Sequence, residues 1–230
     1  MGGIFDAIAS SYLREDAHWG CDLDVLKNAL DAAVKKSQHP RYVDLGCGLG
    51  FHISFLGNLY PEAAVVGVDS SLRMLEQARK RLDSPNAGNI ALVHASISEF
   101  NDGEKYDVVS CMNNTLNNLY EHGVPPPELR KKVIRHARYL LRAGGHLILS
   151  VYNREKLDLA DYGQRLFVLS ESDVERGDLF VEYRTNDSIE KYYSHWSTDA
   201  ELTELLEHNG FKLELLEKRM ARFVVKARAT

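Results

Sequence analysis

The 230-residue chain has few of the features that mark secreted, membrane or nucleic-acid-binding proteins. Its three cysteines, Cys21, Cys47 and Cys111, have the spacing of neither a disulfide framework nor a zinc site. No apolar run approaches the roughly 20 residues of a membrane span, and no signal peptide is recognisable. The net charge of −5 argues against a basic face for nucleic acid. These absences predict a cytoplasmic protein without a metal site, a membrane partner or a nucleic-acid partner.

Glycine is concentrated where it is most informative, in the stretch Arg41-Tyr-Val-Asp-Leu-Gly-Cys-Gly-Leu-Gly50. Residues 42–45 have the pattern of a short buried strand, and an amphipathic segment follows from Phe51 to Leu59. The glycines between them, Gly46, Gly48 and Gly50, permit positive φ and a close approach of a ligand to the backbone. The stretch therefore predicts a strand, a ligand-binding turn and the beginning of a helix.

An acidic residue ends the next predicted strand, which covers Ala64 to Asp69. Ser70 or Ser71 then caps a helix that ends near Arg81. A carboxylate at this place in a Rossmann-like sheet can accept hydrogen bonds from both hydroxyls of a ribose. Nicotinamide enzymes use the same device, but the third glycine of their fingerprint would fall at Phe51. Asp44, just before the turn, favours a cationic ligand instead.

The remaining pattern predicts one α/β domain with a doubly wound, Rossmann-like, seven-stranded and mostly parallel sheet. Further strands are expected over residues 90–95, 105–111 and 146–152, with a helix over 129–141. Antiparallel strands over 179–185 and 189–196 predict a hairpin inserted after the fifth strand. Thr198 should cap a helix to about Asn209, and strands over 211–216 and 223–227 should close the sheet.

In this order, residues 40–152 resemble the class I S-adenosylmethionine-dependent methyltransferases. Asp44 with the alternating glycines is similar to their motif I, and "Leu-Leu-Arg-Ala-Gly-Gly-His-Leu-Ile-Leu" resembles their passage into strand five. The resemblance implies an enzyme that uses S-adenosyl-L-methionine as its cofactor. It also implies a set of cofactor-binding residues, namely Tyr12, Asp44, Gly46, Cys47, Gly48, Asp69, Ser70, Met74, Ser96, Ile97 and Met112.

The N-terminal region has apolar residues at helical spacing over residues 4–12 and again from Leu23 to Val34. A pair of packing helices would explain this pattern. The string Phe5-Asp-x-Ile-Ala-x-x-Tyr12 also resembles a helix that closes over the cofactor in small-molecule methyltransferases. The resulting division is a helical lid (1–36), a cofactor-binding core (40–152), a substrate cap (153–197) and a closing helix with two strands (198–230).

The acceptor side is expected at the end of the fourth strand. The loop Met112-Asn-Asn-Thr-Leu-Asn-Asn-Leu119 is similar to the Gly-Asn-Ser-x-x-x-Leu loop of glycine N-methyltransferases, with Asn114 at the position of their asparagine. The chain departs from that pattern, because Asn113 replaces the glycine and Tyr152 takes the place of an arginine, with Arg154 two positions late. The resemblance implies in-line methyl transfer to a small molecule, with an amine favoured.

Position and side-chain chemistry indicate candidate residues for the acceptor side. Asn113, Asn114 and Tyr193 are expected to bind the substrate, and His195 and Tyr152 are candidates for a catalytic base. A packed histidine would explain His195 equally well. A non-catalytic cofactor-binding subunit and a nicotinamide-dependent oxidoreductase stay open as alternatives, as does the choice between monomer and homodimer.

Overall fold

The structure is a computed structural model that describes residues 20, 22–82, 87–159, 166–184 and 189–230. The helix expected over residues 4–12, which contains Tyr12, lies outside these residues, and so does Cys21. The described helices and strands begin and end as follows: α2 Leu23–Val34, β1 Arg41–Leu45, α3 Phe51–Leu59, β2 Ala64–Asp69, α4 Leu72–Arg81, β3 Ile90–His94, β4 Tyr106–Cys111, α5 Pro126–Leu140, β5 Leu141–Tyr152, β6 Leu166–Val168, β7 Asp178–Arg184, β8 Ile189–His195, α6 Asp199–Glu207, β9 Phe211–Arg219 and β10 Arg222–Ala229.

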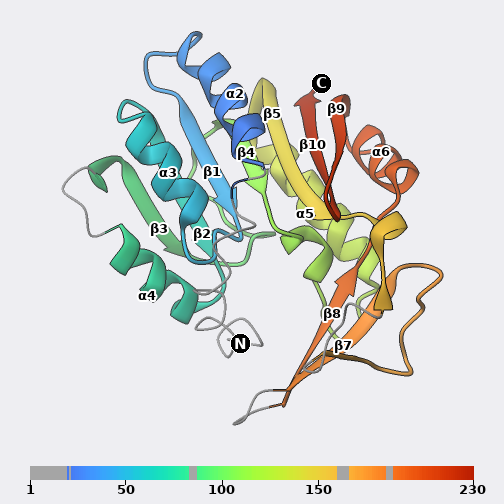
Figure 1. The fold of residues 1–230 in the computed structure, drawn as a ribbon. Coiled ribbons are helices and arrows are strands. Elements are labelled where there is room, and N and C mark those ends of the chain that lie inside the picture. The colour runs from blue at the N-terminus through green and yellow to red at the C-terminus, as the bar shows by residue number, and fades with distance from the viewer. Residues whose placement is uncertain (1–19, 21, 83–86, 160–165, 185–188) are drawn as a thin grey trace.

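Seven strands form one mixed sheet in the order β3-β2-β1-β4-β5-β10-β9. The pairs from β3 to β5 are parallel, whereas β10 runs antiparallel to both of its neighbours. The chain crosses from β1 to the neighbouring β2 and later to β4 on its other side, so the strand order reverses at β1 (Figure 1). Such a reversal opens a crevice at the carboxyl ends of the strands. The Rossmann-like α/β fold expected from the sequence is therefore present.

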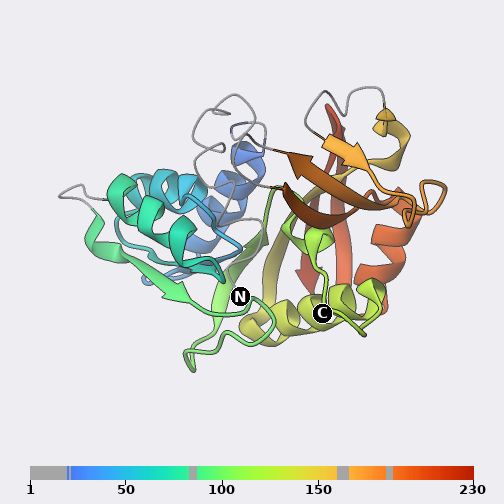
Figure 2. The ribbon, with the colours of Figure 1, turned by 90° about the horizontal axis from the view of Figure 1, so that it is seen from below.

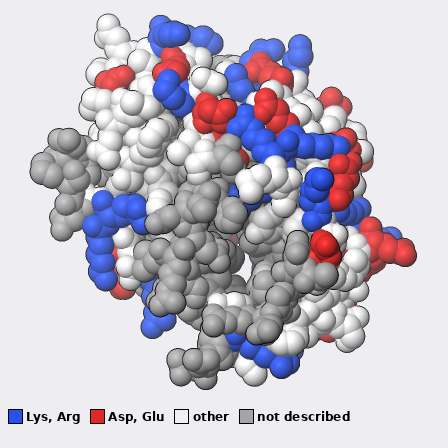
Figure 3. Space-filling view, in the orientation of Figure 1, with Lys and Arg blue, Asp and Glu red and all other residues white. Residues whose placement is uncertain are grey.

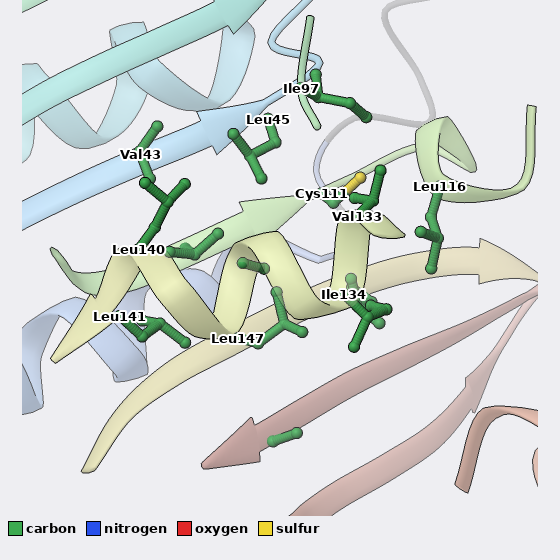
Figure 4. Close-up of a cluster of buried hydrophobic side chains, with 14 of the residues drawn as sticks. Val43, Leu45, Ile97, Cys111, Leu116, Val133, Ile134, Leu140, Leu141 and Leu147 are labelled. Atoms are coloured by element: carbon green, nitrogen blue, oxygen red, sulfur yellow. The ribbon is translucent and has the colours of Figure 1, made fainter. Parts of the chain in front are cut away.

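Helices cover both faces of this sheet. Figures 1 and 2 show α2, α3 and α4 on one face and α5 and α6 on the other. Each face has its own buried cluster: Ile134 and Leu206 belong to the α5–α6 cluster, and Leu26 and Ile53 belong to the α2–α3 cluster. Figure 4 shows the first cluster, in which side chains of α5 meet those of β1, β4 and β5. None of the described helices has the length and apolar character needed to cross a membrane.

A second, three-stranded antiparallel sheet contains β6, β7 and β8. It follows β5 in the chain, and Figures 1 and 2 show it beside the carboxyl end of the large sheet. Trp196, at the end of β8, stacks on Tyr152 at the end of β5, with ring centroids 4.6 Å apart. Backbone hydrogen bonds between Ser197 and Tyr152 (2.9 Å) and between Arg154 and Ser197 (2.9 Å) join the same two segments. The small sheet is therefore attached to the end of β5.

The observed strand β5 is longer than the pattern predicts. It begins at Leu141 rather than His146, because Leu141 pairs with Tyr106 and the register then shifts before Val108 pairs with His146. The intervening Gly144 has a φ of +73°. Glycine adopts this conformation without the steric cost of a Cβ, so a segment that resembles a helix-ending turn in sequence is an irregular part of the strand.

A buried polar chain lies beneath the carboxyl end of β1. The Tyr42 hydroxyl lies 2.8 Å from Ser110 Oγ, which donates to Asp44 Oδ1 at 2.6 Å. Asp44 is 1% exposed. Burial raises the pKa of Asp44, the hydrogen bond from Ser110 opposes this rise, the charge of Asp69 adds to it, and the resulting pKa is about 7. Asp44 therefore binds its proton far more tightly in the folded than in the unfolded chain.

This difference predicts a pH-dependent contribution to stability. Between roughly pH 4 and 7 the folded state keeps a proton on Asp44 that the unfolded state has lost, so the contribution of Asp44 falls as pH rises. The fall is at most about 1.4 kcal/mol per pH unit. Asp44→Asn keeps a neutral acceptor for Ser110, so the free energy of unfolding of the variant, measured by urea denaturation from pH 4 to 8, should lack this fall.

The exposed Asp173 offers a matched control, because Asp173→Asn removes a carboxylate from the surface. Its unfolding free energy should run parallel to that of the wild type across the same pH range. If the Asp44→Asn curve also runs parallel to the wild type, Asp44 does not hold a proton in the folded state near neutral pH.

Candidate active site

A cavity lies at the carboxyl ends of β1, β2, β3 and β4. It is open to solvent at its mouth, and its empty space including that mouth is about 890 Å³. Each of the four strands contributes the residues that directly follow it. The lining residues are Gly46, Cys47, Gly48, Leu49, His52, Asp69, Ser70, Met74, Ser96, Ile97, Asn113, Thr115, Asn118 and Leu119.

The glycine turn after β1 is fixed to the neighbouring strand. The amides of Gly46 and Cys47 both donate to the carbonyl of Val68 in β2, at 2.7 and 3.0 Å. A Cβ at Gly46 would lie 2.3 Å from the Thr115 side chain, so glycine is needed there for packing. A Cβ at Gly48, where φ is +50°, would meet no atom of the described residues within 4 Å. Gly48 therefore leaves space on the cavity side of the turn.

Asp69 joins the two sides of this cavity. Its Oδ2 accepts a hydrogen bond from the Gly48 amide, and its Oδ1 accepts one from the Ser71 amide, each at 2.8 Å. Ser71 caps α4, where its side chain accepts from the amide of Met74 at 3.1 Å. A carboxylate oxygen can accept more than one hydrogen bond, so these two amides do not prevent Asp69 from accepting from a ligand.

Asp44 lies beneath the same turn without lining the cavity. Its Oδ2 is 3.8 Å from His52 Nδ1 and, within the described part of the chain, accepts no hydrogen bond. A buried carboxylate oxygen without a donor is costly, and a positive charge nearby would lower the pKa of Asp44 and favour its charged form. A cationic ligand at this end of the cavity would therefore favour the ionised form of Asp44.

Apolar side chains form another part of the wall. Leu49 and Met74 pack together with Phe51, and the guanidinium carbon of Arg81 lies 3.5 Å from the centre of the Phe51 ring. Ile97 belongs to the α5–α6 cluster and also lines the cavity. This wall can hold a flat apolar ring while Asp69 holds a polar group beside it.

The asparagines that follow β4 occupy different environments. Asn113 and Asn114 both have positive φ, at 52° and 62°, which asparagine tolerates better than most residues. Asn113 lines the cavity, whereas Asn114 has no exposed surface. The Asn114 amide accepts from the Tyr152 backbone N–H (2.9 Å) and donates to Ser194 Oγ (3.1 Å) and Asn118 (2.9 Å). Asn114 therefore joins the loop to β5 and β8.

Nine of the predicted residues line the cavity, and six described ones, including Asp44 and Asn114, do not. Those in the wall are Gly46, Cys47, Gly48, Asp69, Ser70, Met74, Ser96, Ile97 and Asn113. Met112 is buried in the α2–α3 cluster, and Tyr152 stacks on Trp196. Tyr193 and His195 share a face of β8, as expected, but both side chains bond to the Asp178 carboxylate rather than lining the cavity.

His195 lies between two carboxylates. Its Nδ1 is 2.8 Å from Asp178 and its Nε2 is 3.6 Å from Glu201. Burial alone would raise the pKa of Glu201, but hydrogen bonds from His195, the Thr198 amide and Arg154 lower it to about 2. Burial also acts to raise the pKa of Asp178, and hydrogen bonds from His195 and Tyr193 lower it overall. The His195 ring is therefore flanked by carboxylates from β7 and α6, and it does not line the cavity.

Sequence reasoning missed several residues of the wall. His52 is not among the predicted residues, yet it lines the cavity while its Nδ1 faces Asp44. Leu49, Thr115, Asn118 and Leu119 also contribute. A signal existed for the last three, because the asparagine-rich loop is adjacent to the residues that were chosen.

Comparisons with known proteins agree with this geometry. Residues 43–145 match the sequence model of a family described as a methyltransferase domain. A trans-aconitate 2-methyltransferase of Methylobacterium nodulans is 34% identical over 102 residues, which are 44% of this chain and 37% of that protein. The chain spans less than half the length of the first curated relatives that it matches.

Solved structures resemble the whole chain more closely in fold than in sequence. The CcbJ methyltransferase from Streptomyces caelestis has a TM-score of 0.73 at 22% identity, with 100% of this chain and 99% of that chain covered. CalS10, an amino pentose methyltransferase from Micromonospora echinaspora, has a TM-score of 0.66 at 18% identity, with 97% of each chain covered. At these identities the likeness establishes the fold. The sequence match to a methyltransferase domain covers residues 43–145, just under half of the chain, so the activity and the cofactor of the whole chain are proposals.

Proposed function

We propose that the chain transfers a methyl group from S-adenosylmethionine to a small-molecule acceptor, with an amine as the methylated group. The observation that carries the proposal is the hydrogen bond that holds Asp69 beside Gly48 in the cavity wall. Gly48 leaves room for a ligand against the backbone, and Asp69 is held beside it by two amides. The preference for an amine rests on the resemblance of residues 112–119 to the glycine N-methyltransferase loop.

The residues of the cavity fit the cofactor group by group. Asp69 would accept hydrogen bonds from the ribose hydroxyls, and the Gly46–Gly48 backbone would lie along the amino-acid part. Leu49, Met74 and Ile97 supply apolar surface for the adenine ring. Asp44 places a carboxylate beneath the turn, near the positive charges of the ligand. When bound, S-adenosylmethionine supplies a methyl group already activated by a sulfonium centre.

The protein's part in such a reaction is to orient the acceptor and exclude water, and orientation alone can supply several kcal/mol. Asn113, Asn118 and Leu119 form the side of the cavity after β4, where the acceptor would lie. Tyr120 continues this side and contacts Phe180 of β7 edge to face, with centroids 5.3 Å apart. The small sheet would thus cap the acceptor, as the hairpin pattern predicts. The predicted lid keeps its standing as a prediction only for residues 1–19, which lie outside the described part of the chain, because α2 packs on the face of the large sheet.

The surface supports a small acceptor. In the face shown in Figure 3, acidic side chains lie among the basic ones over the described residues. A nucleic-acid partner would require a continuous basic region to neutralise phosphates. A nicotinamide cofactor is disfavoured because Phe51, which packs with Leu49 and Met74, stands where its fingerprint requires glycine.

Gly48 provides a direct test of the cofactor position. Gly48→Ala should place a methyl group in the space against the turn and weaken binding of S-adenosylhomocysteine, the demethylated cofactor, by about tenfold or more, as measured by titration calorimetry. Gly103→Ala is a matched control, because Gly103 also has positive φ (+80°) and open space around a Cβ, but it lies outside the cavity. Both variants should lose a similar roughly 1–2 kcal/mol of stability.

The two glycine variants should therefore differ in their affinity for S-adenosylhomocysteine but not in their free energy of unfolding. Equal affinity in Gly48→Ala and the wild type would mean that no ligand approaches this turn.

Asp69 tests the ribose contact. Asp69→Ala should remove two hydrogen bonds to a charged acceptor, each worth roughly 1.5–3 kcal/mol, and weaken binding of S-adenosylhomocysteine by a hundredfold or more. Titration calorimetry measures the effect, and the exposed Asp173→Ala should bind as the wild type does. Because Asp69 also holds two amides, Asp69→Asn serves as a milder variant. Unchanged affinity in both Asp69 variants would contradict the assignment.

Asn114 should act through position rather than contact. Asn114→Ala removes three hydrogen bonds that join the loop to β5 and β8, so the free energy of unfolding should fall by about 1–3 kcal/mol. Asn118→Ala, which removes the half-buried member of the pair, should cost less. Urea denaturation measures both. A stability cost in Asn114→Ala no larger than that in Asn118→Ala would show that its amide is not a structural link.

A further inference from the structure

Arg222 lies next to the proposed acceptor side of the cavity, but the site described above assigns it no role. Arg222 begins β10 and pairs with Tyr152, the last residue of β5. Its Nη1 donates a hydrogen bond to Asn113 Oδ1, and Asn113 lines the cavity. The Arg222 side chain is 16% exposed. A guanidinium therefore lies one hydrogen bond behind the cavity wall on the side assigned to the acceptor.

The charge of Arg222 is only loosely compensated. The carboxylate found nearest to it in the described chain, Asp22 Oδ2, lies 3.9 Å from Nη1, beyond hydrogen-bond distance. Nη1 is also the only guanidinium nitrogen of Arg222 for which the described residues provide a hydrogen-bond acceptor. A guanidinium has five N–H donors in a planar fork, so one edge can bind a further planar acceptor.

Neighbouring arginines differ in this respect. Arg154 donates to both carboxylate oxygens of Glu201 at 2.7 Å and to the Trp196 carbonyl at 2.9 Å. Arg219 is held by Asp24 and Glu217 at the other end of the β9–β10 turn. These side chains are fully engaged in ion pairs that hold elements together. Arg222 alone among the three combines a weak carboxylate contact with a cavity-lining partner.

The orientation of Arg222 is also restricted. Its guanidinium carbon lies 5.7 Å from the centre of the Tyr152 ring, within range of a cation–π contact. The Tyr152 ring is itself stacked on Trp196 at an interplanar angle of 24°. Asn113 fixes one end of the fork through its hydrogen bond to Nη1. Such preorganisation lowers the entropy cost of binding a ligand.

We propose that Arg222, oriented by Asn113 and Tyr152, binds a carboxylate group of the acceptor. The inference rests on the proposed function and narrows it, because the acceptor then carries a carboxylate in addition to the group that is methylated. A planar carboxylate matches the guanidinium fork with two parallel hydrogen bonds. The same contact would orient the far end of the acceptor relative to the cofactor side of the cavity.

The test compares matched carboxylates and carboxamides on the full chain saturated with S-adenosylhomocysteine. The probes are benzoate with benzamide, anthranilate with anthranilamide, and β-alanine with β-alaninamide, and ligand-observed NMR titration measures their affinities. At least one carboxylate should bind about tenfold or more tightly than its carboxamide. This preference should vanish in Arg222→Gln and persist in Arg219→Gln, which removes an arginine from the same turn.

Arg222→Lys covers the case in which the glutamine variant does not fold, because it keeps the charge but loses the fork, and it should retain only part of the preference. Absence of a carboxylate preference in the wild type, or its persistence in Arg222→Gln, would overturn the inference. If Arg222 variants instead lose affinity for S-adenosylhomocysteine itself, Arg222 binds the cofactor's carboxylate and the inference also fails. Failure of the wild type to bind S-adenosylhomocysteine would instead contradict the proposed function, so the two failures are distinguishable.

Discussion

The two hydrogen bonds from backbone amides to the Asp69 carboxylate determine the geometry of the whole site. The Gly48 amide belongs to the turn after β1, and the Ser71 amide belongs to the beginning of α4. The parallel register that pairs Leu45 with Val68 brings these segments together at one edge of the sheet. Because both amides converge on one carboxylate, the turn and the helix cannot move independently. A ligand that binds Asp69 therefore meets a wall whose two halves are already aligned.

A second group of charges attaches the small sheet to the large one. Asp178 at the start of β7 bonds to His195 at the end of β8, and His195 faces Glu201 in the first turn of α6. Arg154, just after β5, closes the chain of contacts at Glu201. His195 is buried and Asp178 and Arg154 are partly buried, so their interactions are screened less than those of exposed pairs. The sheet β6-β7-β8 is thus fixed relative to β5, as a cap for the acceptor would have to be.

The parts of the fold that depend on local pattern were predictable from the sequence. The bounds of α2 and α3 agree with the expected ones, because apolar spacing and the flanking glycine or proline define them within the segment itself. Asp69 was also predictable, since a strand end and a following helix cap are both local signals. By contrast, the early start of β5 depends on its pairing with Tyr106, which no pattern within residues 141–146 contains.

The environments of single polar residues were the least predictable part. His195 resembles a base in an aromatic strand, but its partners Asp178 and Glu201 come from other elements, and only the folded chain shows that both flank the ring. Asn113 and Asn114 are adjacent and chemically identical, yet the backbone directs one toward the cavity and the other into the protein. Alternation along a segment indicates that neighbours face different ways, but not which of them faces the ligand.

Sequence motifs indicate the residues proposed to bind the cofactor better than those proposed to bind the acceptor. The cofactor side is made by residues that directly follow consecutive strands of the parallel sheet, so a motif of glycines and one acid describes it. The acceptor side is made where β10 runs back antiparallel to β5, which brings Arg222 beside Asn113 although 109 positions separate them. The sequence around residues 152–154 gives no sign that Arg222 lies beside this end of β5. In the proposed arrangement, acceptor recognition therefore depends on a strand that is distant in sequence, whereas the cofactor side depends on a local motif.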